Sequence, residues 1–361
     1  MRPAFSTYSS ALRFLALLLV ILLSPSIVPA SWLPSREQTY ASQNLVKAPF
    51  PWLQHVIFEE KGPIDVALLG SSRILFSLDA VRFQEQLSQR LGRPATVRVL
   101  GWMGSGFDID YFIAKDLLAH REVRHLIFYD DFGPNRNNLY PALFRFQEDA
   151  GDLAGLSLAA KCRYYFASLA MLPRNLLCNI RPNFRADLHG PTFSYTLDGA
   201  QVVDQLGSLK LAAYSDTGSG ATGPYAPFTP QTQASPSDVR IYSPETAGDF
   251  VFESKPLASW ETHFIHLFSD LARQHRVSLA MLNIPQLEEI RNPQLVQRTD
   301  WRNLFGPDLV MVGVLPEKMF HGLSNEDTAR LFWDPMHLNA NGQEYFSSII
   351  TPALLDICSK P

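Results

Sequence analysis

The chain has 361 residues, of which 46% are hydrophobic and 18% are charged, and its formal net charge is −4. This is the composition of a globular protein that can bury a core of its own, in one large or two modest domains. Because no Lys/Arg-rich block is present, the sequence lacks a phosphate-neutralising surface, and we do not expect nucleic acid as a partner.

Cysteine and histidine usage gives little sign of a metal site. Cys162, Cys178 and Cys358 are too few and too irregularly spaced for a zinc site or a disulfide framework. Cys162 and Cys178 can pair in an oxidising compartment; three unpaired buried thiols are the alternative. His263 and His266 lie three residues apart on an expected helix, but no third ligand stands out. We therefore expect no metal and no cofactor.

The N-terminus has the pattern of an export signal or a membrane anchor. Arg2 and Arg13 precede the apolar run FLALLLVILL (residues 14–23), and small residues ending at Ala30 offer a candidate cleavage site. The run reaches the roughly 20 residues of a membrane span only if the following SPS is included. We expect a signal or anchor over residues 1–30. It leaves the rest of the chain either membrane-anchored outside the cytoplasm or, after cleavage, periplasmic or secreted.

After a proline-interrupted connector (residues 31–63), apolar runs alternate with helical periodicities. The expected strands are residues 66–72, 96–101, 125–131, 277–284 and 309–314, and the expected helices are residues 78–91, 109–120, 258–275 and 341–357. Buried strands separated by helices are typical of an open, mostly parallel α/β sheet. We expect the aromatic residues of the helix at 258–275 to belong to the core.

Residues 136–252 interrupt this alternation. A helix candidate at residues 153–172 is expected to stop at Pro173, and a tract of Gly, Ser, Thr and Pro at residues 213–238 predicts a flexible loop or a lid. We therefore expect one α/β domain over residues 64–361 with a loop-rich insertion at about 136–252.

Chemically useful residues follow several of the expected strands. Gly70-Ser71-Ser72-Arg73 ends the first strand, Gly104 lies in a glycine-rich turn after the second, and Asn135 follows the third. Asp334 and His337 come after the last strand and a loop. The carboxyl ends of parallel strands meet at one edge of the sheet, where ligands bind. A hydroxyl, oxyanion donors and an Asp–His pair are the parts of an acyl-transfer site.

This set of blocks, in this order, resembles the SGNH (GDSL-like) hydrolase superfamily. The blocks are LLGSSR, VLGWMG, FGPN and DPMH, of which the last, with its trailing LNANG, is the most specific. The resemblance implies a flavodoxin-like three-layer α/β/α sandwich. It also implies Ser72 as nucleophile, His337 as base and Asp334 as the group that orients the base. The oxyanion hole would be formed by Ser72, Gly104 and Asn135.

The chain departs from the family pattern at several positions. Ser71 replaces the family's aspartate, so that either serine can be argued to be the nucleophile. Val99 stands where the second block often has Asn, and Arg136 where the third often has Asp. Arg73 and Trp333 are expected to contact the substrate; the alternatives are that Arg73 fixes the turn and Trp333 packs.

A Gly-Ser-Ser block behind an N-terminal membrane segment looks like the extracytoplasmic partners of polysaccharide O-acetylation and of teichoic-acid D-alanylation. The resemblance therefore implies an esterase or O-acyltransferase outside the cytoplasm, acting on acylated glycans or small acyl esters, with a membrane acyltransferase as partner. The alternative is a catalytically inactive envelope protein that keeps the fold to bind glycan or a partner.

Overall fold

The computed structural model describes residues 8–41, 50–102, 106–129, 145–180, 201–203, 209–211, 230, 240–242, 252–253, 258–287, 290, 296–297, 302–306, 308–314 and 316–360. The chain divides into two compact units. One is formed by Met1–Gln43 with Leu139–Gly190, and the other by Asn44–Asn138 with Pro191–Pro361. The first half of the expected insertion therefore belongs with the N-terminal segment, a pairing that the sequence did not predict.

The second unit is built on a six-stranded sheet with the order β2-β1-β3-β8-β10-β6. Its strands are β1 (Ile64–Gly70), β2 (Val97–Gly101), β3 (Val123–Tyr129), β6 (Arg240–Tyr242), β8 (Ser278–Leu282) and β10 (Val310–Gly313). Five strands are parallel, and β6 pairs antiparallel with β10. The parallel part has the flavodoxin-like order. The predicted fold class is confirmed, whereas β6 lies in the tract that was expected to be loop-rich.

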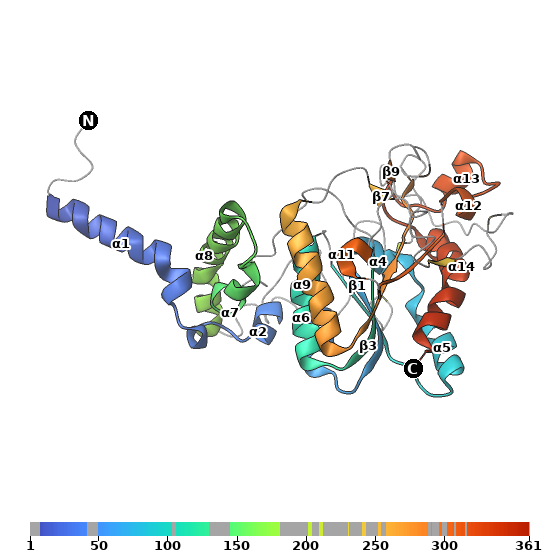
Figure 1. The fold of residues 1–361 in the computed structure, drawn as a ribbon, viewed down its shortest axis with the longest axis horizontal. Helices are drawn as coiled ribbons and strands as arrows, with labels where there is room; N and C mark the ends of the chain where they lie inside the picture. Colours follow the sequence, from blue (N-terminus) through green and yellow to red (C-terminus); the bar gives the residue numbers. More distant parts are fainter. Residues whose placement is uncertain are drawn as a thin grey trace. The chain divides into compact units, whose positions relative to one another are not determined.

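Helices cover both faces of this sheet and give it three layers (Figure 1). The helices are α5 (Ala80–Leu91) and α14 (Ala340–Cys358) on one face, and α6 (Phe107–His120) and α9 (Ser259–His275) on the other. Because successive side chains of a strand point to opposite faces, each central strand supplies both cores. In β3, Ile127 joins the core with α5 and α14. Its neighbour Phe128 lies 5.3 Å, centroid to centroid, from Phe268 of α9.

Two prolines lie inside helices instead of ending them. The helix α14 continues through Pro352, where the sequence predicts an interruption, and α8 (Leu158–Ile180) continues through Pro173. The expectation that a helix stops at Pro173 was therefore wrong. A proline within a helix removes one backbone hydrogen bond, a cost that tertiary packing can offset.

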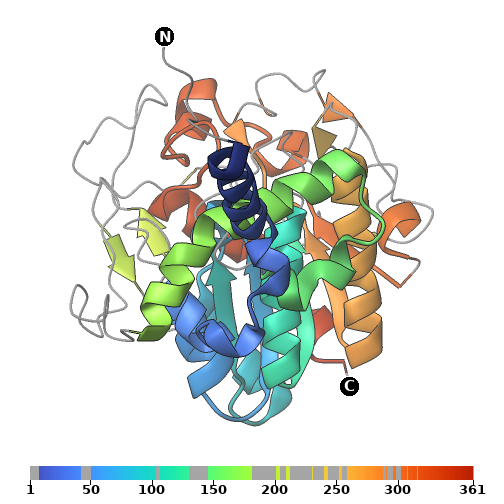
Figure 2. The same ribbon diagram turned by 90° about the vertical axis from the view of Figure 1, so that its left-hand side faces the viewer.

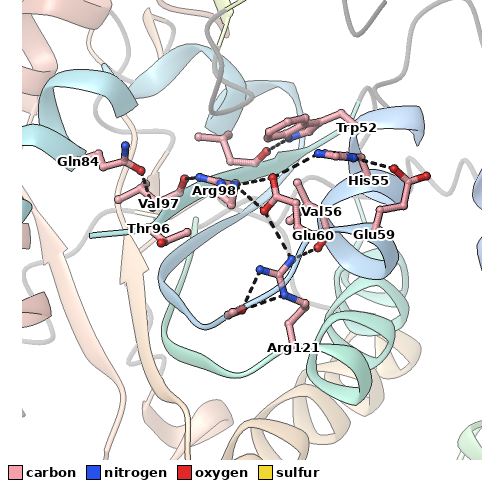
Figure 3. Close-up of polar contacts among 12 residues, drawn as sticks. Trp52, His55, Val56, Glu59, Glu60, Gln84, Thr96, Val97, Arg98 and Arg121 are labelled. Atoms are coloured by element: carbon pink, nitrogen blue, oxygen red, sulfur yellow. Dashed lines mark hydrogen bonds and ion pairs between the residues drawn. The ribbon is translucent and has the colours of Figure 1, made fainter. Parts of the chain in front are cut away.

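The edge strand β2 is covered by the segment that precedes β1 (Figure 3). Trp52, in α3 (Phe50–Gln54), donates its indole N–H to the carbonyl of Val99 at 2.8 Å. On the same strand, the side-chain oxygen of Gln84 accepts from the Val97 N–H at 2.9 Å. An uncovered edge strand would offer these backbone groups to another chain. The described residues after 49 in the expected connector are therefore part of the α/β unit.

An ion network ties the same segment to the amino ends of the strands (Figure 3). Glu60, just before β1, pairs with Arg98 of β2 at 3.0 Å and with Arg121 at 3.6 Å. Arg121 is buried and also donates to the carbonyl of Gly62 at 3.0 Å. Ligands of such sheets bind at the opposite, carboxyl ends of the strands, so we regard this network as structural.

The first unit is helical, with α1 (Tyr8–Ile27), α2 (Arg36–Ala41), α7 (Phe146–Asp149) and α8. Tyr165 of α8 donates its hydroxyl to the carbonyl of Leu22 in α1 at 2.6 Å. Gln147 of α7 donates to the carbonyl of Pro25. Both views of the ribbon show α8 running crosswise to α1 (Figures 1 and 2). The N-terminal helix is thus packed into a unit with the chain beyond residue 144.

Among the described residues, α1 is the one helix long and apolar enough to cross a membrane. It includes Pro25, which has no N–H to donate to the carbonyl of Ile21. The Ser24 hydroxyl donates to that carbonyl instead, at 2.6 Å. Such side-chain compensation is how apolar helices tolerate proline. This helix is compatible with a signal or with a membrane anchor.

The cysteines do not form the pair that the sequence left open. Cys162 and Cys178 both lie on α8, and a rise of 1.5 Å per residue separates them by about 24 Å, far beyond disulfide reach. Cys162 is an exposed free thiol and Cys358 a buried one. Burial, with a smaller effect of Asp65, raises the pKa of the Cys358 thiol to about 12.

Candidate active site

The first candidate residues lie in the turn from β1 into α4 (Ser72–Ser77), a helix outside the expected helix ranges although the turn itself predicts that Ser71 or Ser72 caps a helix. Gly70 is the last residue of β1. A larger residue does not fit at this position, because its Cβ would lie 2.5 Å from the Tyr129 ring. Ser71 then caps the helix: its backbone is extended and its side chain accepts from the Arg73 N–H at 3.4 Å. Ser72 follows as the first helical residue. The turn therefore gives the two serines different directions.

Asp334 and His337 are presented by a short loop before α14 that is fixed at both ends. Phe332 and Leu338 pair as a bridge, and the Trp333 N–H donates to the His337 carbonyl at 2.8 Å. The Pro335 carbonyl, at the tip, accepts from the Leu287 N–H at 3.0 Å. A loop held in this way can keep an imidazole in one orientation.

The residues after this loop explain why LNANG follows the Asp-x-x-His pair. The Asn339 side chain accepts from the Gly342 N–H at 3.0 Å and so caps α14, while its amide donates to the carbonyls of Arg330 and Phe332. A Cβ on Gly342 would lie 1.9 Å from the Leu331 carbonyl oxygen. Asn339 and Gly342 together seat the loop against the start of the helix.

The structure brings Ser72, His337 and Asp334 together from opposite ends of the chain. Ser72 Oγ lies 2.7 Å from His337 Nε2. His337 Nδ1 lies 2.7 Å from Asp334 Oδ2 and 2.9 Å from Oδ1. A carboxylate at Nδ1 requires the proton on that nitrogen, which leaves Nε2 free to accept from the serine. Contacts of this kind can activate a serine hydroxyl as a nucleophile.

Asp334 is held in its ionised form. Burial alone would raise the pKa of this carboxyl, but hydrogen bonding and charge from His337, with the backbone N–H groups of Met336 and His337, outweigh it and lower the pKa. Those N–H groups donate to Oδ1 at 2.7 and 2.8 Å. An ionised Asp334 can orient the imidazole and stabilise its charged form.

The two serine hydroxyls have different hydrogen-bond partners. The Ser71 hydroxyl is hydrogen-bonded to the Tyr129 hydroxyl at the end of β3, whereas the Ser72 hydroxyl faces His337. The ring of Phe76, one turn along α4, meets the His337 ring edge-on with centroids 5.5 Å apart. The geometry favours Ser72 over Ser71 as the nucleophile.

The two residues expected to contact substrate have other contacts. Arg73 is 3% exposed and donates to the carbonyl of Ile284, with its guanidinium 5.2 Å from the Tyr129 ring centroid. This supports the alternative that Arg73 fixes the turn. Trp333 is half-buried and packs against the hydrophobic core, as its alternative interpretation predicts, and its ring centroid lies 6.2 Å from that of His337. Trp333 is therefore close enough to the imidazole to border a bound substrate.

The rest of the expected oxyanion hole falls on parts of the chain that are not described. Gly104, Asn135 and Arg136 lie outside the described residues. Ser72 is the first residue of α4, so its backbone N–H has no acceptor within the helix. Val99, at a position where the resembled family often has Asn, lies in β2 and accepts from Trp52.

The histidine pair considered for metal binding lies on α9. His266 is exposed, and His263 is half-buried with its ring 5.3 Å from that of Phe264, which belongs to the core. Within the described part of the chain, no three His, Cys, Asp or Glu side chains gather as a metal site would require.

Phe76 and Tyr129 were not singled out from the sequence. The apolar run Ile74-Leu75-Phe76 directly after Gly-Ser-Ser-Arg could have predicted α4 and placed Phe76 one turn beyond the serine. Tyr129 ends a buried strand, the position at which such sheets place functional groups. Its contact with Ser71 depends on the pairing of β1 with β3.

In comparisons with known proteins, no family model and no curated relative matches this chain. The resemblance to SGNH hydrolases therefore stays a prediction. The contacts among the side chains of Ser72, His337 and Asp334 are the structural observation that bears on function.

Proposed function

We propose that this protein is a serine-dependent acyl-ester hydrolase or O-acyltransferase that acts outside the cytoplasm on acylated glycans or small acyl esters. The observation that carries the proposal is the continuous chain of contacts from Ser72 Oγ through His337 to Asp334, with both links at 2.7 Å. Residues 265 positions apart meet in hydrogen-bond contact at the carboxyl end of β1. Nucleophile, base and orienting carboxylate are the parts that acyl transfer needs.

In the first step, His337 Nε2 takes the Ser72 proton as Ser72 Oγ attacks the ester carbonyl carbon. The C–O bond to the alcohol then breaks, and the imidazolium returns its proton to the departing alkoxide. Asp334 keeps Nδ1 protonated and stabilises the imidazolium. The product of this half-reaction is an acyl group esterified to Ser72.

In the second step, an acceptor hydroxyl attacks the acyl-Ser72 carbonyl and loses its proton to His337. The bond between the carbonyl carbon and Ser72 Oγ then breaks, and the imidazolium returns the proton to Oγ, which restores the free serine. Water as acceptor gives hydrolysis, and a sugar hydroxyl gives transfer to a glycan. The Ser72 N–H at the start of α4 can donate to the oxyanion. Gly104 and Asn135 are the further donors that the resemblance implies, each worth about 3 kcal/mol of barrier.

A serine-directed fluorophosphonate probe on the full chain in detergent tests the proposal. We expect labelling of the wild type and of Ser71→Ala, and none of Ser72→Ala, whose activity should fall by about 10⁴-fold or more. Labelling that survives in Ser72→Ala but not in Ser71→Ala would reverse the assignment. A folded wild type that does not label would favour the inactive envelope protein that binds glycan or a partner.

Acceptor choice is tested with p-nitrophenyl acetate as donor, with and without an oligosaccharide. Acetyl groups recovered on the sugar would favour the transferase and a membrane acyltransferase as partner. Release to water alone, unchanged by the sugar, would favour the esterase.

We also propose that α1 is retained as a membrane anchor. Cleavage after Ala30 would remove the backbone carbonyls of Leu22 and Pro25, to which Tyr165 and Gln147 donate. A signal peptide that is cut away has no reason to be built into the unit that remains. Full-length chain recovered from membranes, with its N-terminus intact, supports retention; a chain that begins at Ser31 refutes it.

A further inference from the structure

The helix α8 presents an unusual face to its surroundings. Its exposed residues recur every three or four positions and form one stripe, while its buried residues, Tyr164, Ser168, Leu172 and Asn175, form another. The exposed stripe consists of Leu158, Ala159, Cys162, Arg163, Phe166, Ala170, Pro173, Leu177 and Ile180. Only one of these residues is charged, which is the reverse of what a helix facing water normally shows.

The exposure of the larger side chains is substantial. Leu158 is 78% exposed, Phe166 55%, Leu177 40% and Ile180 77%. Contiguous apolar surface on this scale marks a site that contacts another protein or a membrane. Because α8 spans 23 residues, the exposed stripe is about 34 Å long.

The contacts of α8 with α1 indicate that the exposed stripe of α8 faces a lipid bilayer. Tyr165 reaches the carbonyl of Leu22, about five residues and about 7.5 Å before the end of α1 at Ile27. If α1 spans the bilayer, this contact lies near the boundary between headgroups and acyl chains. Interfacial helices bury their apolar face about 5–10 Å into that region. The middle of α8 is therefore held at the depth that such helices occupy.

The direction and charge of α8 also agree with a position at the bilayer surface. The helix runs crosswise to α1 in both ribbon views, as a helix in the plane of the membrane does beside a spanning one (Figures 1 and 2). Between Leu158 and Ile180 the sequence has Lys161, Arg163 and Arg174 and no acidic residue. This positive charge complements anionic headgroup phosphates. The half-buried Tyr165 is of the kind enriched at membrane interfaces, and the exposed Phe166 is of the kind that interfacial helices turn toward the lipid.

We propose that α8 is an interfacial membrane helix whose exposed stripe lies in the outer surface of the bilayer that α1 spans. The proposal rests on retention of α1 as an anchor and is independent of the esterase chemistry. It predicts a second, monotopic attachment that fixes how the helical unit meets the lipid. A membrane protein seated on the exposed stripe is the competing occupant.

Cys162 on the exposed stripe provides the probe. In the full chain carrying Cys178→Ala and Cys358→Ala, Cys162 is labelled with the environment-sensitive fluorophore NBD. The protein is then reconstituted alone into phosphatidylglycerol–phosphatidylethanolamine vesicles, and emission and quenching by nitroxide lipids are measured. We expect a blue-shifted emission that lipids with a shallow nitroxide quench. The same label on Gln89→Cys in a Cys162→Ala background, on α5, is the comparison site.

Two substitutions sharpen the test. Phe166→Asp places a charge on the exposed stripe and should shift the emission of the Cys162 label to the red and reduce its quenching. Val81→Asp, at an exposed apolar residue of α5, should leave both signals unchanged. Urea unfolding midpoints serve as the control for folding.

Each result has one meaning. Vesicle-bound protein with a water-like, unquenched label at Cys162 overturns the interfacial helix and leaves a protein partner as the occupant. Protein that does not float with the vesicles refutes the anchor and with it this proposal. Fluorophosphonate labelling of Ser72 reports separately on the proposed enzyme.

Discussion

The substitution Asp334→Asn tests whether the carboxylate sets the state of the imidazole. In the native site, Asp334 Oδ1 accepts from the backbone N–H groups of Met336 and His337, and Oδ2 faces His337 Nδ1 at 2.7 Å. An asparagine can keep the two backbone bonds with its one oxygen. Its NH₂ group then replaces Oδ2 and faces Nδ1. The imidazole proton must then move from Nδ1 to Nε2. A protonated Nε2 is a donor and can no longer accept the Ser72 hydroxyl proton.

The expected loss follows from this change of tautomer. The equivalent substitution in the serine-protease triad lowers kcat by about 10⁴-fold, which equals about 5.5 kcal/mol of barrier. Stability should change much less, by about 1–2 kcal/mol, because two charge-assisted bonds become neutral ones. Asp334→Ala should lose the same activity and more stability, since the two N–H groups also lose their acceptor.

The assay is kcat/KM with p-nitrophenyl acetate, together with the rate of fluorophosphonate labelling. A matched control is Asp79→Asn, which changes the same residue type at the start of α5; asparagine also caps helices, so activity should stay unchanged. If Asp334→Asn keeps more than about a tenth of the wild-type activity while folding normally, the carboxylate does not orient the base. The mechanism proposed above would then fail at that step.

Three further predictions address the structure of the α/β unit. Gly342→Ala should lower the urea midpoint by the equivalent of about 3 kcal/mol and reduce activity, because the added Cβ would lie 1.9 Å from the Leu331 carbonyl oxygen. An unchanged midpoint would contradict this close approach of α14 to Leu331. Cys358, whose pKa burial raises to about 12, should react with iodoacetamide only in urea, as mass spectrometry can show. Burial alone would raise the pKa of Asp65, but Arg93 and the Thr96 N–H outweigh it and lower the pKa. Ionised Asp65 therefore stabilises the fold above its ordinary pKa of about 3.9, and this contribution is lost as the pH falls further. Arg93→Gln should lower the urea midpoint at pH 7, and the difference from wild type should shrink below about pH 4.

Local patterns were sufficient to predict the elements that carry the site. Continuous apolar runs gave β1, β2, β3, β8 and β10 to within a few residues, because strands buried on both faces leave a strong signal. The parallel order then brings their carboxyl ends to one edge, which is why Ser72 and the Asp334–His337 loop could be associated from sequence. The contact of Ser72 with His337 is a long-range one that no local pattern encodes.

The helical unit could not be predicted in the same way. Its contacts join residues more than 120 positions apart, such as Pro25 with Gln147, and neither partner has a sequence signal for the other. The N-terminal run indicated only an apolar helix, and the stretch after residue 136 indicated only a break in the α/β alternation. Pairing of this kind is decided by packing and by single hydrogen bonds.

Hydrophobic periodicity also does not show whether a given face of a helix contacts water, protein or lipid. Along α8, the exposed stripe is largely apolar, whereas the buried residues Tyr164, Ser168, Leu172 and Asn175 include two polar side chains, so hydrophobicity alone does not show which side of the helix faces water. On α5, charged residues of both signs mark the side that faces water, whereas α8 has only basic charged residues between Leu158 and Ile180, of which Arg163 alone lies on the exposed stripe. A helix that faces protein on one side and lipid headgroups on the other would have this composition. Contact with the bilayer would account for its basic and aromatic residues. Contact with water alone would not explain why Phe166, Leu177 and Ile180 lie on the same exposed face.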